Sequence, residues 1–121
     1  MLLRTPAADS VEKVVFARGE TLHAPHLIDL EVAQVLRRYA RDGLIDDQRA
    51  RQALDDLAAL PLIRYPHDVL IGRIWELRHN LTAYDAAYVA LAEILPAVLI
   101  TRDARLGSAR GHRARIRVVE S

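Results

Sequence analysis

The sequence predicts an α/β fold with a short, mostly parallel sheet. Segments with helical spacing of apolar residues alternate with short apolar segments of strand length, which is the order found in α/β domains. The clearest strand is the continuous apolar run Ala97-Val98-Leu99-Ile100. The chain has 121 residues, is 51% hydrophobic and contains no repeat or linker, so we expect one globular domain over residues 1–121.

Two elements are predicted before the longest helical stripe. Thr5-Pro6 is typical of a helix start, and the valines at positions 11, 14 and 15 follow at helical spacing, so a helix is expected from there to Gly19. Residues 21–24 then form a strand candidate that ends at Pro25.

The remaining elements follow in a regular order. Apolar residues three and four positions apart predict a helix over residues 27–42, ended by Gly43, and another over residues 46–60. A strand candidate at 62–65, a helix over 68–78 and a helix capped by Thr82 that runs to Leu95 come next. Residues 115–119 are the last strand candidate.

Composition excludes several classes of protein. Without cysteine the chain has no disulfides, thiolate zinc site or cysteine nucleophile. The longest apolar-rich stretch, residues 83–100, is interrupted by Asp85, Glu93 and Pro96, so we expect no membrane-spanning helix and no membrane partner. Since the N-terminal residues also lack the order of a secretory signal, we expect cytoplasmic residence.

Glu31, Asp85 and Asp103 are the candidate catalytic and metal-binding residues. In open α/β sheets, ligands bind beyond the carboxyl ends of the strands, where the following helices begin. Glu31 comes early in the helix after the first strand candidate, Asp85 in the first turn of the helix capped by Thr82, and Asp103 just after the apolar strand. We therefore expect three segments far apart in sequence to bring carboxylates to one edge of the sheet.

Each acid also has an ordinary structural explanation. Asp85 follows Thr82 at the spacing of a capping box, and Asp103 is placed to cap a short turn. Glu31 lies beside the apolar stripe, between Ile28 and Val35, where a charge needs a partner. Taken one at a time, these alternatives stay open.

A group of three carboxylates would need a compensating cation. Two carboxylates about 4 Å apart repel by roughly 4 kcal/mol at an effective dielectric of about 20, so folding would not assemble three without a cation or a raised pKa. Carboxylate oxygens favour Mg²⁺ or Mn²⁺. Such a site suits attack of metal-activated water on a phosphodiester.

Arginines crowd the chain from residue 102 onwards, although the net charge is only +1. Arg102, Arg105, Arg110 and Arg113 are candidate RNA contacts, because guanidinium groups suit phosphate oxygens. The alternative is a solvated end of an arginine-rich chain, in which Lys13 is the only lysine.

The segment NLTAYDAAYVALAE at residues 80–93 resembles the signature of VapC-type toxins of the PIN-domain superfamily. LITRDARL at 99–106 and APHLIDLEV at 24–32 are similar to the same family, so the resemblance covers essentially the whole chain. Glu31, Asp85 and Asp103 match three of the four family acids, and Thr101 matches a polar position that supports the last one.

The resemblance implies a PIN-like three-layer α/β/α sandwich and a metal-dependent endoribonuclease toxin of a VapBC-type toxin–antitoxin system. It also implies Mg²⁺ or Mn²⁺ as cofactor, RNA as substrate, a cognate VapB-type antitoxin and a homodimer.

One part of the family pattern has no counterpart in this sequence. Family members begin with a central strand that ends in the first metal-binding aspartate and lies between the strands matching residues 21–24 and 97–100. Here residues 1–6 resemble the end of the helix after that strand, so we expect the central strand to be absent and two strand edges to be left unpaired. Either Met1 is an internal methionine of a longer, active protein, or the chain is truncated and catalytically impaired.

Two other functions therefore stay open. A truncated PIN body could be a non-catalytic module that binds the antitoxin or RNA, and a different Mg²⁺-dependent phosphohydrolase would use the same kind of acids.

Overall fold

The computed structural model describes residues 13–16 and 21–119, and the chain divides into two compact units. We call residues 28–61 the helical unit, and residues 13–27 and 62–119, so far as they are described, the sheet unit. No helix within the described part of the chain is long and apolar enough to cross a membrane.

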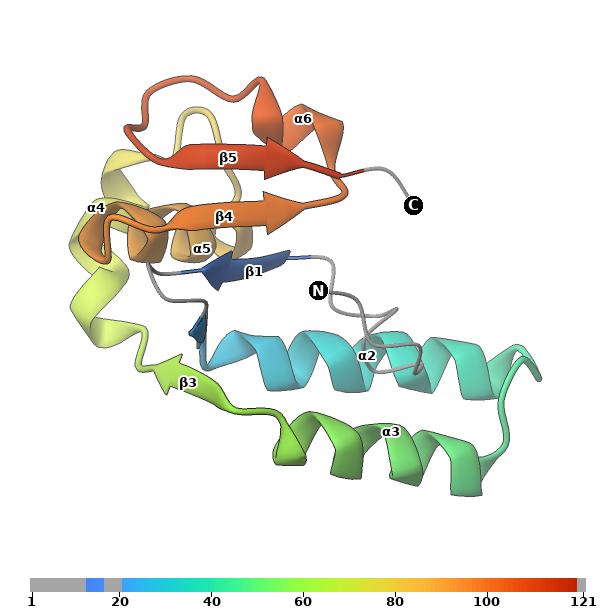
Figure 1. Cartoon of the computed structure of the whole chain (residues 1–121). Helices are drawn as coiled ribbons and strands as arrows, with labels where there is room; N and C mark the ends of the chain where they lie inside the picture. Colours follow the sequence, from blue (N-terminus) through green and yellow to red (C-terminus); the bar gives the residue numbers. More distant parts are fainter. Residues whose placement is uncertain (1–12, 17–20, 120–121) are drawn as a thin grey trace. The chain divides into compact units, whose positions relative to one another are not determined.

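The helical unit consists of α2 (Leu27–Arg41, whose first residue is counted with the sheet unit) and α3 (Asp47–Ala59), which run side by side in opposite directions (Figure 1). Both helices were predicted from the spacing of their apolar residues. The buried residues of α2 include Ile28, Val32 and Leu36, which share one face of the helix.

The turn between these helices follows from its polar and glycine residues. Gly43 has a φ of +76°, the left-handed conformation that glycine adopts without a Cβ penalty, and so ends α2 as predicted. Asp46 caps α3, because its Oδ1 accepts a hydrogen bond of 2.7 Å from the backbone N–H of Arg49.

The sheet unit contains one sheet of five strands in the order β3-β2-β1-β4-β5. The pairs β2/β3 and β4/β5 are parallel, and β1 is antiparallel to both of its neighbours, so four strands share one direction. The mostly parallel sheet of an α/β fold is therefore confirmed. The five strands are β1 (Lys13–Phe16), β2 (Leu22–Pro25), β3 (Leu62–Tyr65), β4 (Val98–Thr101) and β5 (Arg115–Val118).

Strand β1 corrects two of our expectations. Residues 13–16 were predicted as part of a helix but form a strand, and the position between β2 and β4, which was expected to be vacant, is filled by β1. The predicted unpaired edges are therefore absent, because Val15 lies opposite both His23 of β2 and Leu99 of β4. The remainder of the predicted helix, residues 5–12 and 17–19, lies outside the described residues.

The reason for the strand is its composition and its surroundings. Val14, Val15 and Phe16 are β-branched or aromatic residues, which favour a pleated, half-buried position. Val15 is fully buried, and the main-chain groups of β1 satisfy two neighbouring strands that would otherwise have lacked partners.

Helix α5 (Ala83–Ile94) forms the centre of the core. Every residue from Ala86 to Ala92 is buried, and the helix packs on β1, β2 and β4, as Figure 1 shows for β4. A helix that is apolar on all sides is typically enclosed in this way. The 3-10 helix η1 (Asp68–Leu70) and α4 (Ile71–Glu76) precede α5, and α6 (Ala104–Gly107) follows β4.

Candidate active site

Asp85 lies in the first turn of α5, as predicted. Thr82 is the N-cap of this helix, and its hydroxyl accepts a hydrogen bond of 3.1 Å from the backbone N–H of Asp85. The main chain of Asp85 thus takes part in the helix cap that its spacing from Thr82 predicted. Its carboxylate, however, has another partner from a distant part of the sequence.

That partner is Lys13, the first residue of β1. Its Nζ donates to Oδ1 of Asp85 over 2.6 Å, and the side chains of Lys13 and Asp85 are only 11% and 28% exposed. The ammonium also lies 4.6 Å from the centre of the buried Tyr88 ring, which attracts a cation. The Asp85 carboxylate is therefore half-buried and already binds a positive charge.

Asp103 follows the carboxyl end of β4 and caps α6. Its backbone N–H donates to the hydroxyl of Thr101 over 3.0 Å, and its Oδ1 accepts from the backbone N–H of Arg105 over 2.9 Å. The hydrogen bond from the Arg105 side chain, with smaller contributions from backbone N–H groups, lowers the pKa of the Asp103 carboxyl. Thr101 is buried and its hydroxyl fixes the turn that presents Asp103. Its supporting role in catalysis stays a prediction.

Electrostatics link the two carboxylates of the sheet unit. The pKa of Arg105 is raised, first by its hydrogen bond to Asp103 and in smaller part by the charge of Asp85. Lys13, which holds Asp85, is also the register partner of Thr101, two residues before Asp103. The start of α5 and the end of β4 thus bring two of the three predicted acids to one edge of the sheet.

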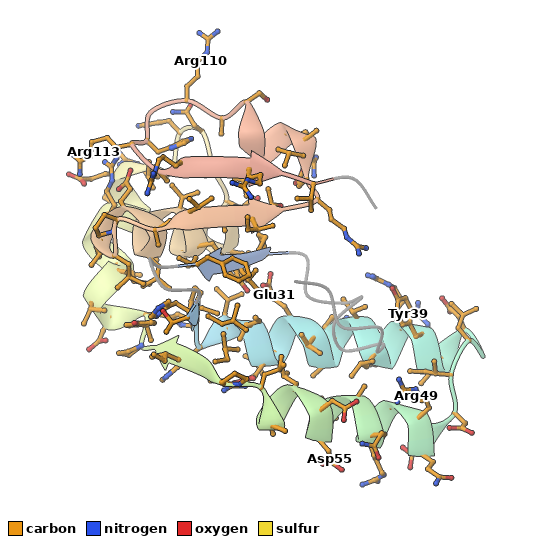
Figure 2. The ribbon with its side chains drawn as sticks, in the orientation of Figure 1. Glu31, Tyr39, Arg49, Asp55, Arg110 and Arg113 are labelled. Carbon is orange, nitrogen blue, oxygen red and sulfur yellow. The ribbon has the colours of Figure 1, made fainter. Side chains whose placement is uncertain are left out.

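Glu31 belongs to the helical unit and lies in the second turn of α2, where it is partly buried (Figure 2). The structure thus brings Asp85, Thr101 and Asp103 to one sheet edge, while Glu31 is carried by the other unit. Within residues 13–16 and 21–119, no three histidine, aspartate or glutamate side chains form a group that could hold a metal ion. The role of Glu31 as a metal ligand stays a prediction.

The four candidate arginines lie at two ends of the sheet unit. Arg102 and Arg105 flank Asp103 at the carboxyl end of β4. Arg110 and Arg113 lie in the loop before β5, and Figure 2 shows their side chains projecting outwards. Because Arg115 pairs with Val98, at the start of β4, this loop ends at the sheet edge opposite the acids.

Lys13 is the residue of this site that the sequence analysis missed. It was noted only as the single lysine among seventeen basic residues. The run of two valines and a phenylalanine directly after it indicates a strand, but nothing local indicates that the strand starts beside Asp85, which is 72 residues away.

The comparison with known families agrees with this fold. The sequence matches the PIN domain family over residues 2–111, and the chain belongs to that family. Within it, the chain is similar to three proteins of Mycobacterium tuberculosis that are named as VapC ribonucleases, so it belongs to the VapC type.

The three relatives differ in how much of the chain they match. Ribonuclease VapC9 is 50% identical over 88 residues, which cover 73% of this chain and 69% of the relative. Ribonuclease VapC1 is 49% identical over 98 residues, covering 80% and 74% of the two chains. Ribonuclease VapC12 is 40% identical over 119 residues, covering 98% of this chain and 91% of the relative.

Proposed function

We propose that this chain is a divalent-metal-dependent endoribonuclease toxin of the VapBC type, with Asp85, Asp103 and Glu31 as its metal-binding and catalytic residues. The observation that carries the proposal is that two carboxylates from distant segments lie at one edge of the sheet, and one of them binds the ammonium of Lys13. The ribonuclease activity named for the relatives supports the substrate.

The donor set fits Mg²⁺ or Mn²⁺. Both ions prefer carboxylate oxygens, and the ammonium of Lys13 marks a cation position beside the Asp85 carboxylate. When bound, such an ion supplies activated water and stabilises charge on a phosphodiester. Asp85 and Asp103 would hold it at the edge of the sheet.

The protein's own contribution is to hold these oxygens in place. Thr82 fixes the first turn of α5 and with it Asp85, and Thr101 fixes the turn of Asp103. We expect Arg102 and Arg105, which lie before and after Asp103 in the sequence, to contact the phosphates of an RNA strand at this edge.

The test is cleavage of single-stranded RNA by the purified chain with Mg²⁺ or Mn²⁺. Asp85→Asn is expected to lower the rate about 100-fold or more, since even residues that only support a metal ligand contribute about 10–100-fold. The matched control is Asp47→Asn, which removes an exposed acid whose side chain is 80% accessible on α3. Cleavage that resists both a chelator and Asp85→Asn would refute the proposal.

Partners follow from the same proposal. We expect a cognate VapB-type antitoxin that suppresses cleavage, a second copy of the chain in a homodimer, and residence in the cytoplasm. Co-expression with a candidate VapB-type antitoxin, followed by size-exclusion chromatography with light scattering, measures both assemblies. If the chain binds RNA or antitoxin but no condition yields cleavage, the second candidate function applies, namely a binding module whose Asp85 stays blocked by Lys13.

A further inference from the structure

The ammonium of Lys13 binds one oxygen of the Asp85 carboxylate, a group that the proposed metal would also use. It lies 2.6 Å from Oδ1, and both side chains are largely shielded from solvent. Mg²⁺ binds carboxylate oxygens at about 2.0–2.1 Å, so an ion on Oδ1 and the ammonium would be in close contact. Two positive ions repel at such a distance, and water screens this repulsion less at a half-buried site than at an exposed one.

The backbone of β1 holds Lys13 at this position. The strand pairs on both sides, with Lys13 opposite Thr101 in β4 and Val15 opposite His23 in β2. Directly opposed residues of antiparallel strands project from the same face of the sheet. The fully buried Val15, two residues further along the strand, fixes the register, so the ammonium is delivered to Asp85 by the fold itself and not by a mobile surface chain.

We infer that Lys13 is an autoinhibitory counter-ion, which occupies the Asp85 carboxylate in the resting protein and must be displaced before a divalent cation binds there. The inference rests on the proposed metal-dependent function and adds a threshold to it. The threshold is the metal concentration at which the divalent ion displaces the ammonium. Binding energies of two competing ligands are reciprocal, so the metal must loosen Lys13 by the same factor by which Lys13 weakens the metal.

The unmodified chain provides the first test, because Lys13 is its only lysine. An amine-selective acetylating reagent at fixed pH, with peptide mass spectrometry, reports this one side chain, and the α-amino group labelled in the same sample is the internal reference. Mg²⁺ is expected to accelerate acetylation of Lys13 and leave the reference unchanged. In Asp85→Asn, acetylation should be fast without Mg²⁺ and insensitive to it.

Direct metal binding provides the second test. Free Mn²⁺ measured by electron paramagnetic resonance gives the apparent Kd for the wild-type chain and for Lys13→Gln. The variant should bind Mn²⁺ more tightly by roughly 5- to 150-fold, the usual range of coupling between two sites. The gain should vanish in the double variant with Asp85→Asn. Arg51→Gln, which removes one positive charge from an exposed ion pair on α3, should leave the Kd unchanged.

The outcomes separate this inference from the proposed function. Metal-accelerated acetylation of Lys13 together with tighter Mn²⁺ binding by Lys13→Gln supports it. If wild-type chain cleaves RNA at a Mg²⁺ concentration that leaves acetylation of Lys13 unchanged, the inference is wrong and the proposed function stands. If neither the wild-type chain nor Lys13→Gln binds Mn²⁺ or cleaves RNA, both are wrong. The acetylation test uses the wild-type chain, so it can refute the inference even if a Lys13 variant fails to fold.

Discussion

The ion pair between Arg73 of α4 and Glu93 of α5 gives the sharpest stability prediction. The Glu93 side chain is only 5% exposed, and Arg73 binds it through two hydrogen bonds, Nε to Oε1 at 2.7 Å and Nη2 to Oε2 at 3.0 Å. A third bond comes from the backbone N–H of Arg113, at 2.7 Å from Oε2. This carboxylate therefore joins α5, α4 and the loop that leads into β5.

Replacing Arg73 with methionine keeps an apolar side chain of similar length but leaves Glu93 as a buried charge with one of its three hydrogen bonds. Removing one partner of a buried pair costs about 3–5 kcal/mol, and because Arg73 is 24% exposed we expect the lower end, about 3 kcal/mol. The double variant Arg73→Met/Glu93→Met removes the stranded charge. It should recover most of this loss, since a buried ion pair and an apolar pair of similar volume have similar stabilities.

Urea unfolding followed by far-ultraviolet circular dichroism measures both variants. Burial acts to raise the pKa of Glu93, but the hydrogen bonds from Arg73 and Arg113 outweigh it and hold the pKa below its ordinary value of 4.5. A folded-state pKa below the unfolded one stabilises the protein at pH above that ordinary value, and this contribution disappears as the pH falls through the lowered pKa. The difference between wild type and Arg73→Met should therefore shrink on acidification. If Arg73→Met lowers the free energy of unfolding by less than about 0.5 kcal/mol at pH 7, or if the double variant is no more stable than Arg73→Met, the ion pair does not stabilise α5.

Two further predictions concern the loop before β5 and the turn that follows β4. Gly111 has a φ of +89°, and a Cβ there would lie 2.7 Å from the Asn80 side chain, so Gly111→Ala should lower the stability measured by thermal unfolding by about 1–3 kcal/mol. Gly72→Ala is the control: a Cβ at this position on α4 meets open space and should raise stability by about 0.5–1 kcal/mol. Thr101→Val removes the acceptor for the Asp103 N–H and should reduce RNA cleavage by about 10–100-fold, while Thr101→Ser, which keeps the hydroxyl, should retain activity.

Much of this architecture follows from local sequence, because its signals are local. The apolar spacing of α2 and α5, the Thr82 and Asp46 caps and the apolar run of β4 act within a few residues of one another. The expected meeting of Asp85 and Asp103 needed only one further rule, that parallel strands end at the same edge of a sheet.

The first strand could not be obtained in this way. Together with Val11, its two valines are spaced as in a helical turn, and a segment of four residues is too short for its periodicity to distinguish helix from strand. What decides its conformation is the presence of two strands, β2 and β4, with unsatisfied main-chain groups on either side. That information lies far away in the sequence, so the ion pair of Lys13 with Asp85 could not be predicted from local sequence either.

The direction of β1 determines the chemistry of the site. The other four strands bring their carboxyl ends to the edge where α5 begins, and β4 places Thr101 and Asp103 there. Because β1 runs the opposite way, it brings its first residue to this edge, and that residue is the only lysine of the chain. A slip of one residue in register would turn the Lys13 side chain to the other face of the sheet and expose the buried face of Val15. The apolar packing that holds β1 in place thus also keeps the Lys13 ammonium on Asp85. Release of the carboxylate therefore requires movement of the Lys13 side chain and no change in the sheet.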